Sequence, residues 1–137
     1  MRIAVVDGQG GGIGRVIIER IRAELGPDVF IIGLGTNALA TSVMLRAGAN
    51  EGASGENAIE YLSDKVDVIA GSVAIIAANS FLGELTPRMA KAIASSPAMK
   101  VLLPLNRSGI EIAGVVDEPL PLQVGHLVEK IKQMVKA

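Results

Sequence analysis

Residues 7–14 read Asp7-Gly8-Gln9-Gly10-Gly11-Gly12-Ile13-Gly14, and this glycine loop decides the fold of the chain. The loop follows a short apolar run, residues 3–6, and leads into an amphipathic segment that ends at Leu25. Strand, glycine loop and helix in this order are typical of the first unit of a nucleotide-binding α/β domain. Glycines let the backbone approach a ligand closely, and the N–H groups at the start of the helix attract an anion. The loop therefore predicts a site for a phosphate group.

The number of glycines favours a ligand over a plain turn. A tight strand-to-helix turn needs one or two glycines, whereas this loop holds five within seven residues. Each surplus glycine costs roughly 0.5–1 kcal/mol relative to alanine. The spacing resembles T-G-x-x-x-G-I-G, the fingerprint of short-chain dehydrogenases, with Asp7 in place of the threonine. That resemblance implies that Gly8, Gly12 and Gly14 are the turn, approach and packing glycines, and that the Ile13 N–H faces the phosphate.

The end of the second predicted strand departs from this resemblance. A NAD site needs an acidic side chain there to bond the ribose hydroxyls, yet no Asp or Glu occurs between Asp28 and Glu51. The neutral residues Thr36 and Asn37 stand at that position instead. Either they hydrogen-bond a ribose or an anion, or Thr36 only caps the next helix. A nucleotide or dinucleotide such as NAD(P) therefore stays open as the cofactor.

The composition of the 137 residues fits a single domain, residues 1–137. Half of the chain is apolar but only three residues are aromatic, which suits a parallel sheet buried on both faces by aliphatic side chains. The lack of cysteine excludes disulfides and thiolate chemistry, and a single histidine argues against a protein-only transition-metal site. A net charge of −1 without a basic cluster argues against nucleic acid as a partner.

The apolar runs at residues 29–45 and 68–83 contain Gly, Asn, Thr and Ser. They fall short of the roughly 20 apolar residues that a membrane span requires. No targeting segment precedes the first strand, so we expect a cytoplasmic protein that does not bind a membrane. The high apolar content is compatible with a buried subunit interface, which leaves a homo-oligomer open.

Hydrophobic periodicity predicts further strands at residues 29–34, 66–70 and 99–105, and helices at 12–25, 36–47, 56–63, 87–95 and 120–135. Residues 50–55 are interpreted as a loop or a short strand, and residues 73–83 as a short buried helix or a packed loop. Residues 110–116 follow the strand at 99–105 at hairpin distance, so we expect them to pair with it antiparallel at the sheet edge. The predicted fold is a three-layer Rossmann-like α/β domain with a mostly parallel sheet and an antiparallel edge strand.

Polar residues near the predicted strand ends complete the candidate site. Asn79 either lines the pocket or satisfies nearby backbone groups. Asn106 and Arg107 follow the carboxyl end of a parallel strand, the edge where ligands bind in open α/β sheets. Arg107 is the best-placed cation for a phosphate, unless it belongs to a turn without function. The candidate binding residues are Gly8, Gln9, Gly10, Gly11, Gly12, Ile13, Gly14, Thr36, Asn37, Gly71, Asn79, Asn106 and Arg107; no catalytic or metal-ligating residue is identified.

Two other patterns are interpreted as surface features. Tyr61 and Lys65 match the Y-x-x-x-K catalytic pair of short-chain dehydrogenases, but they precede the fourth strand and fit the polar face of a surface helix better. His126 lies on the last helix, away from its apolar face, and is expected to be solvated.

The chain also resembles, over nearly its whole length, an uncharacterised bacterial family of short Rossmann-like proteins, domain of unknown function 3842. The resemblance rests on residues 7–14, 34–42, 55–59, 75–80, 82–87 and 104–107. It implies a Rossmann-like sheet but no activity, because the family has no assigned reaction.

The favoured hypothesis is a nucleotide-binding module that senses or carries a phosphate-bearing small molecule, since the sequence offers a phosphate loop but no credible acid–base pair. One alternative is a small enzyme for a phosphorylated metabolite, with Glu51 or Glu56 as base and Arg107 as clamp, or a reduced NAD(P)-binding oxidoreductase-like protein. A second alternative is a structural or partner-binding domain whose uncharged run at residues 68–83 forms an interface.

Overall fold

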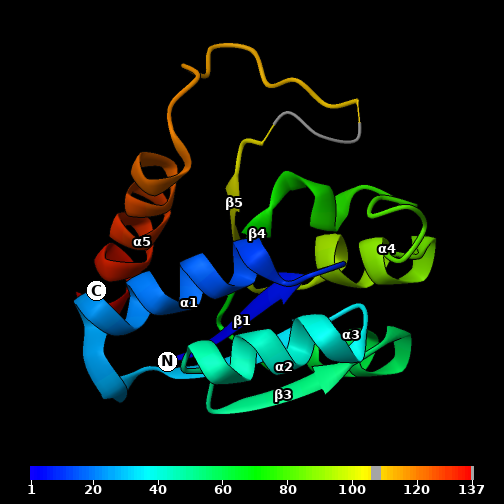
Figure 1. Ribbon diagram of the computed structural model, residues 1–137, viewed down its shortest axis with the longest axis horizontal. Helices are drawn as coiled ribbons and strands as arrows, with labels where there is room; N and C mark the ends of the chain where they lie inside the picture. The colour runs from blue at the N-terminus through cyan, green and yellow to red at the C-terminus, as the bar shows by residue number, and fades with distance from the viewer. Residues whose placement is uncertain (106–108, 137) are drawn as a thin grey trace.

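The computed structural model describes residues 1–105 and 109–136, which form a three-layer α/β fold (Figure 1). Among these residues the sheet has five strands in the order β3-β2-β1-β4-β5, and every pair is parallel. The strands are β1 (Arg2–Asp7), β2 (Phe30–Gly35), β3 (Glu51–Ser54), β4 (Val68–Ser72) and β5 (Met99–Leu103). The helices are α1 (Gly12–Leu25), α2 (Ala38–Ala47), α3 (Glu56–Leu62), α4 (Pro87–Ser95) and α5 (Leu120–Lys136), with the 3₁₀ helices η1 (Gly26–Asp28) and η2 (Val73–Ile76).

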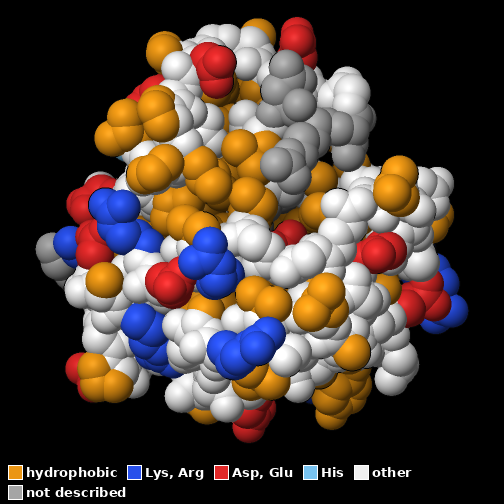
Figure 2. All heavy atoms as spheres, in the orientation of Figure 1, with side chains coloured by type: hydrophobic (Ala, Val, Ile, Leu, Met, Phe, Trp, Pro, Cys, Tyr) orange, Lys and Arg blue, Asp and Glu red, His pale blue; other side chains and the backbone are white. Residues whose placement is uncertain are grey.

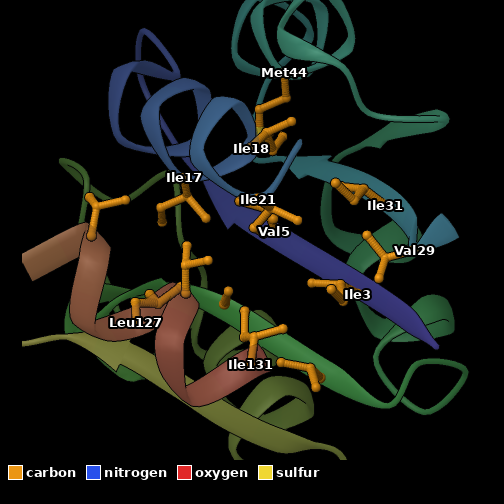
Figure 3. Packing of buried hydrophobic residues seen from close by; sticks show 14 of the residues in the cluster. Ile3, Val5, Ile17, Ile18, Ile21, Val29, Ile31, Met44, Leu127 and Ile131 are labelled. Carbon is orange, nitrogen blue, oxygen red and sulfur yellow. The ribbon is translucent and has the colours of Figure 1, made fainter. Parts of the chain in front are cut away.

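Side chains along β1 alternate between the two faces of the sheet, and each face has its own helices. Ile3 and Val5 point into a core that α1, α2 and α5 cover (Figure 3). Ala4 and Val6 point into the opposite core, which α3, α4 and η2 cover. All four side chains are buried, as expected for the central strand of a parallel sheet with helices on both faces.

Helix α2 lies very close to β2 because that strand carries glycines. A Cβ on Gly33 would lie 2.9 Å from the Cβ of Met44, and one on Gly35 would lie 2.7 Å from the carbonyl oxygen of Asn37. Real Cβ atoms essentially never show such short contacts. The two glycines therefore fix the height of α2 above the sheet and bring its first residues close to the end of β2.

The order of the strands reverses at β1. β2 and β3 lie on one side of β1, whereas β4 and β5 lie on the other. In open α/β sheets the crevice outside the carboxyl ends of the strands at such a reversal is the usual ligand site. Asp7 ends β1 and the glycine loop continues from it, so the loop lies at this crevice.

The predicted antiparallel edge strand at residues 110–116 is wrong. Within the described residues this segment forms no strand, and β5 is the edge of an all-parallel sheet. Gly114 has φ +84°, and the Val115 amide donates to the carbonyl oxygen of Ile112. A turn therefore closes in the middle of the segment and interrupts the extended conformation that pairing with β5 requires.

The uncharged run at residues 68–83 is mostly core. Val68 to Ile75 are buried as β4 and most of η2, while Ile76 and Leu82 are exposed. Only the second part of the run, residues 76–83, reaches the surface, so the partner-binding alternative can rest on those residues alone. In the described part of the chain, no helix combines the length and apolar character needed to cross a bilayer.

Candidate functional site

A buried carboxylate holds the glycine loop in place. Asp7 is 4% exposed, and its carboxylate accepts hydrogen bonds from the amides of Gly8 (2.8 Å) and Gly14 (2.6 Å). The Gly11 amide donates to the carbonyl oxygen of Gly8 (3.0 Å), which closes the turn before α1. A carboxylate that accepts from an amide of the first turn also interacts favourably with the dipole of α1. Asp7 thus binds two of the loop amides that the sequence analysis expected a bound anion to accept from.

Three of the loop glycines are required by the fold. A Cβ on Gly8 would lie 2.7 Å from Phe81 Cγ, and one on Gly14 would lie 2.6 Å from Met44 Sδ. Gly11 has φ +73°, a left-handed conformation that favours glycine. Packing and backbone geometry therefore explain these three positions without any ligand.

Gly10 and Gly12 are not required by the fold. Neither has a positive φ, and a Cβ at either position would meet no other atom within 4 Å in the described part of the chain. Both residues are exposed. The amides of Gly10, Gly12 and Ile13 make no hydrogen bond with any described residue. The rim of the loop therefore combines open space with three unpaired N–H donors.

An acidic side chain does stand at the end of β2, and it comes from a distant part of the sequence. Glu84 lies between η2 and α4, and its Oε1 accepts hydrogen bonds from Thr36 Oγ1 (2.6 Å), the Gln9 amide (2.9 Å) and Asn37 Nδ2 (2.9 Å). Thr36 thus binds Glu84 and does not cap α2. The cap is Asn37, whose Oδ1 accepts from the Ala40 amide at 2.8 Å.

These donors stabilise the ionised form of Glu84. The hydroxyl of Thr36 and then the amide of Gln9 lower the pKa of the Glu84 carboxyl below its ordinary value, with a smaller contribution from Asn37 and against the effect of burial. Since all three donors bond Oε1, Oε2 makes no hydrogen bond to the residues that the structure describes. One carboxylate oxygen is thus fixed, and the other is open to a further donor.

A hollow of about 350 Å³ borders the open rim of the loop. Gly10 and Gly12 line it together with Arg15 and Glu19 of α1 and Arg46 of α2. Arg15 forms an ion pair with Glu19 at 2.7 Å, whereas Arg46 forms none with a described residue. The space beside Gly10 and Gly12 is therefore positively charged on one wall.

The family model described as "Domain of unknown function (DUF3842)" matches residues 2–136. The chain belongs to the DUF3842 family. No curated protein and no solved structure matches the DUF3842 chain. The family assignment brings no reaction or ligand with it, so the function has to be inferred from the geometry described above.

The loop residues and those at the end of β2 lie together in the DUF3842 chain, and Asn79 lies beside them. Gln9 and Asn79 line a second hollow, of about 470 Å³, formed with residues 74–82. Gly71 does not lie in the loop region but within β4, where a Cβ would be 2.8 Å from the carbonyl oxygen of Val6. It is a packing glycine between neighbouring strands. Asn106 and Arg107 lie outside the described residues.

The carboxylates proposed for an enzyme are not assembled into a site. Glu51 begins β3 and is level with Ile32 in the middle of β2, three residues before the carboxyl edge where the glycine loop lies. Glu56 accepts a hydrogen bond from Thr86 Oγ1 (2.6 Å) and lies 3.6 Å from Arg88. It ties α3 to α4. In the described part of the chain, no three His, Cys, Asp or Glu residues are grouped closely enough to hold a metal ion.

The other motif residues lie on the surface, as expected. Tyr61 is 62% exposed, and the Lys65 ammonium lies over its ring and donates to its carbonyl oxygen. His126 is exposed and lies 3.3 Å from Glu118.

Sequence reasoning missed Glu84 and Phe81 in this DUF3842 chain. They lie 75 and 73 residues after Gln9 and Gly8, the loop residues that they contact. No local pattern predicts such contacts. One signal in the sequence pointed to such a residue. No acid follows β2, where Thr36 and Asn37 stand, although a dinucleotide site normally has an acid at that position.

Proposed function

We propose that this DUF3842 chain binds a ribonucleotide or dinucleotide at the carboxyl edge of the sheet. The amides of Gly10, Gly12 and Ile13 would hold a phosphate group, and Glu84 would accept hydrogen bonds from ribose hydroxyls. The observation that carries the proposal is the open rim of the loop. Two glycines that the fold does not need flank unpaired amides there.

The rim supports a phosphate because no internal reason explains its composition. Glycine costs roughly 0.5–1 kcal/mol of chain entropy relative to alanine, and neither Gly10 nor Gly12 recovers that cost through packing or a positive φ. A ligand that approaches the backbone closely does require such positions. Arg46 adds a cation on the wall of the same hollow, which favours an anionic group.

The position of Glu84 supports a ribose. In dinucleotide-binding sheets an acidic residue at the end of the second strand bonds the ribose hydroxyls. Glu84 occupies that place in space, held by Thr36, Asn37 and Gln9. Its second oxygen is directed to no described donor. A carboxylate at this point also disfavours a ligand that carries a phosphate on the ribose, because like charges repel.

Titration of nucleotides against thermal stability tests the proposal. We expect ADP and NAD to raise the melting temperature of the wild-type chain, because a ligand at about 100 times its Kd stabilises the native state by about 2.7 kcal/mol. NADP, with its ribose phosphate, should give a smaller shift. AMP, ATP and FMN complete the panel.

Two variants distinguish the proposed phosphate site at the loop rim from the proposed ribose site at Glu84. Gly12→Ala places a methyl group in the open rim without an internal clash. It should therefore keep or slightly raise the melting temperature of the unliganded chain, since alanine costs less chain entropy than glycine, and it should weaken the binding of every nucleotide. Glu84→Gln should weaken the binding of ADP and NAD and reduce the difference between their affinity and that of NADP. The matched variant Glu51→Gln, on the outermost strand β3 and level with Ile32, should bind all three nucleotides as wild type does. If no nucleotide shifts the melting temperature at millimolar concentration, the proposal fails.

A further inference from the structure

The outer edge of β5 is open and apolar. In the described part of the chain no strand pairs with that edge, so its N–H and C=O groups are a template for a further strand. Met99 is 57% exposed, and Val101 and Leu103 face α5. A hollow of about 450 Å³ runs between β5 and α5 and includes Met99, Val101 and Met134 in its walls. Figure 2 shows hydrophobic side chains gathered in a recess in the upper part of the molecule, above Lys and Arg side chains.

The segment that follows β5 carries apolar side chains that are not buried. Residues 109–119, here named the strap, run to α5 as an open arch above the sheet (Figure 1). Val116 is 72% exposed, and Ile112 and Val115 are each 45% exposed. Val115 and Val116 also line the hollow beside β5. The strap therefore presents hydrophobic residues beside an apolar groove that they do not fill.

A buried polar atom at the same place lacks a partner. Gln123 is 8% exposed and lines the hollow; its Nε2 donates to the carbonyl oxygen of Glu118, but its Oε1 has no hydrogen-bond partner among residues 1–105 and 109–136. Native structures seldom leave a buried acceptor unpaired. No described residue thus supplies a donor for this acceptor at the junction between strap and α5.

The charges around the groove are complementary to one another. Lys130 is exposed on α5 and lines the hollow, and Asp117 is exposed on the strap. Neither forms an ion pair with a described residue. One surface that offers both an unpaired cation and an unpaired anion is suited to a two-fold interface, in which each group meets its opposite on the other copy.

We propose that the groove between β5 and α5 binds a second copy of this chain. The two β5 edges pair antiparallel across a two-fold axis and join the two sheets. This arrangement brings the carboxyl end of one β5, where Pro104 and Val116 line a common hollow, beside the amino end of the other. Val116 of each strap then covers the partner's apolar groove near Met99 and Met134, and Asp117 approaches Lys130 across the interface. The inference is independent of the proposed nucleotide site, because it uses the opposite side of β4.

Analytical ultracentrifugation with exposed-residue variants tests this interface. We expect wild type to sediment as a dimer at micromolar concentration, since stable interfaces of standard size reach roughly micromolar Kd or tighter. Val116→Lys should weaken the dimer by about tenfold or more, because burying an unpaired charge is strongly unfavourable. Val116 is exposed in the monomer, so this change should not impair folding. Leu39→Lys, which replaces a 59% exposed residue on α2, is the matched control and should remain dimeric.

A charge exchange gives a second readout. Asp117→Lys and Lys130→Asp should each weaken the dimer, and the double variant should restore much of the affinity. Wild type that stays monomeric up to about 100 µM, well above the Kd expected for such an interface, would overturn the proposal and leave the groove to a foreign partner. A dimer that Val116→Lys does not weaken would also overturn it, because the interface would then lie elsewhere.

Discussion

Two carboxylates, Asp7 and Glu84, organise the backbone amides around the glycine loop. Asp7 binds the amides of Gly8 and Gly14 from inside, and Glu84 binds the amide of Gln9 from the crevice side. Hydrogen bonds from backbone amides to a carboxylate are stronger than those between neutral groups. These contacts leave a specific subset of amides, at Gly10, Gly12 and Ile13, without a described partner. The two carboxylates therefore bind some of the loop amides, and only the amides along the rim have no described hydrogen-bond acceptor.

The lowered pKa of Glu84 predicts a pH-dependent contribution to stability. Because the folded-state pKa lies below the ordinary value of 4.5, the contribution is fully present above pH 4.5 and is lost as the pH falls through the folded-state pKa. We therefore expect Glu84→Gln to be less stable than wild type at pH 7, and the difference to shrink on acidification toward pH 3. Urea unfolding at several pH values measures it, with Glu51→Gln as the control for loss of one negative charge. A difference that grows in acid would contradict this account.

Left-handed backbone conformations at non-glycine residues of the loop 79–83 predict that a substitution to glycine there stabilises the fold. Leu82 has φ +57° and is 94% exposed, so it bears the cost of a left-handed conformation without burying its side chain. That cost is roughly 1–2 kcal/mol for a non-glycine residue, and glycine's extra chain entropy offsets part of it. Leu82→Gly should raise the free energy of unfolding by about 0.5–1 kcal/mol in urea titrations. Leu45→Gly, at an exposed position inside α2, should lower it by about 1 kcal/mol.

At the scale of elements, glycines set the distance between helices and strands. The position of α2 depends on Gly33 and Gly35 of β2, and the position of α1 depends on Gly14, which contacts Met44 of α2. The ends of β1 and β2 and the starts of their helices are thereby brought close enough for Thr36, Asn37 and Gln9 to share the Glu84 carboxylate. The candidate site therefore depends on close packing of neighbouring elements as well as on the loop itself.

This dependence predicts opposite outcomes for two substitutions that both add one methyl group. Gly35→Ala would place a Cβ 2.7 Å from backbone atoms of α2, and overpacking of this kind typically costs 1–3 kcal/mol. A Cβ at Gly12 meets no atom within 4 Å, so Gly12→Ala should not lower the free energy of unfolding and should raise it by up to about 1 kcal/mol through the smaller chain entropy of alanine. Chemical denaturation of the two variants measures the contrast. Equal destabilisation would show that Gly12 serves packing, and would remove the main support for a ligand at the rim.

At the scale of the whole molecule, one sheet connects two separate hydrophobic cores. Ile17 on α1 and Ile93 on α4 lie in different cores, and both are fully buried. Truncation of either isoleucine to alanine should cost about 2–5 kcal/mol. Because the same strands line both cores, we expect each variant to unfold in a single transition seen alike by calorimetry and circular dichroism. Leu122→Ala, at an exposed position, is the control; separate transitions for the two faces would contradict the expectation.

The sequence predicted those features that depend on neighbouring residues. The parallel strands and the helices that begin at Gly12, Pro87 and Leu120 follow from local periodicity and turn residues, and the structure confirms them. The antiparallel strand was predicted from the same kind of pattern and is wrong, because the turn at Gly114 breaks the extended segment. The ligand and the oligomeric state remain proposals.

The sequence alone determined that a parallel α/β sheet opens with a glycine-rich loop, since strand, turn and helix preferences act over a few residues. The tertiary structure decided which loop amides are already satisfied and which are open. It also supplied the acid at the end of β2 from Glu84, 48 positions after Thr36 in the sequence. Such a contact depends on the path of a connecting loop across the sheet edge, and that path is fixed by the packing of the whole chain.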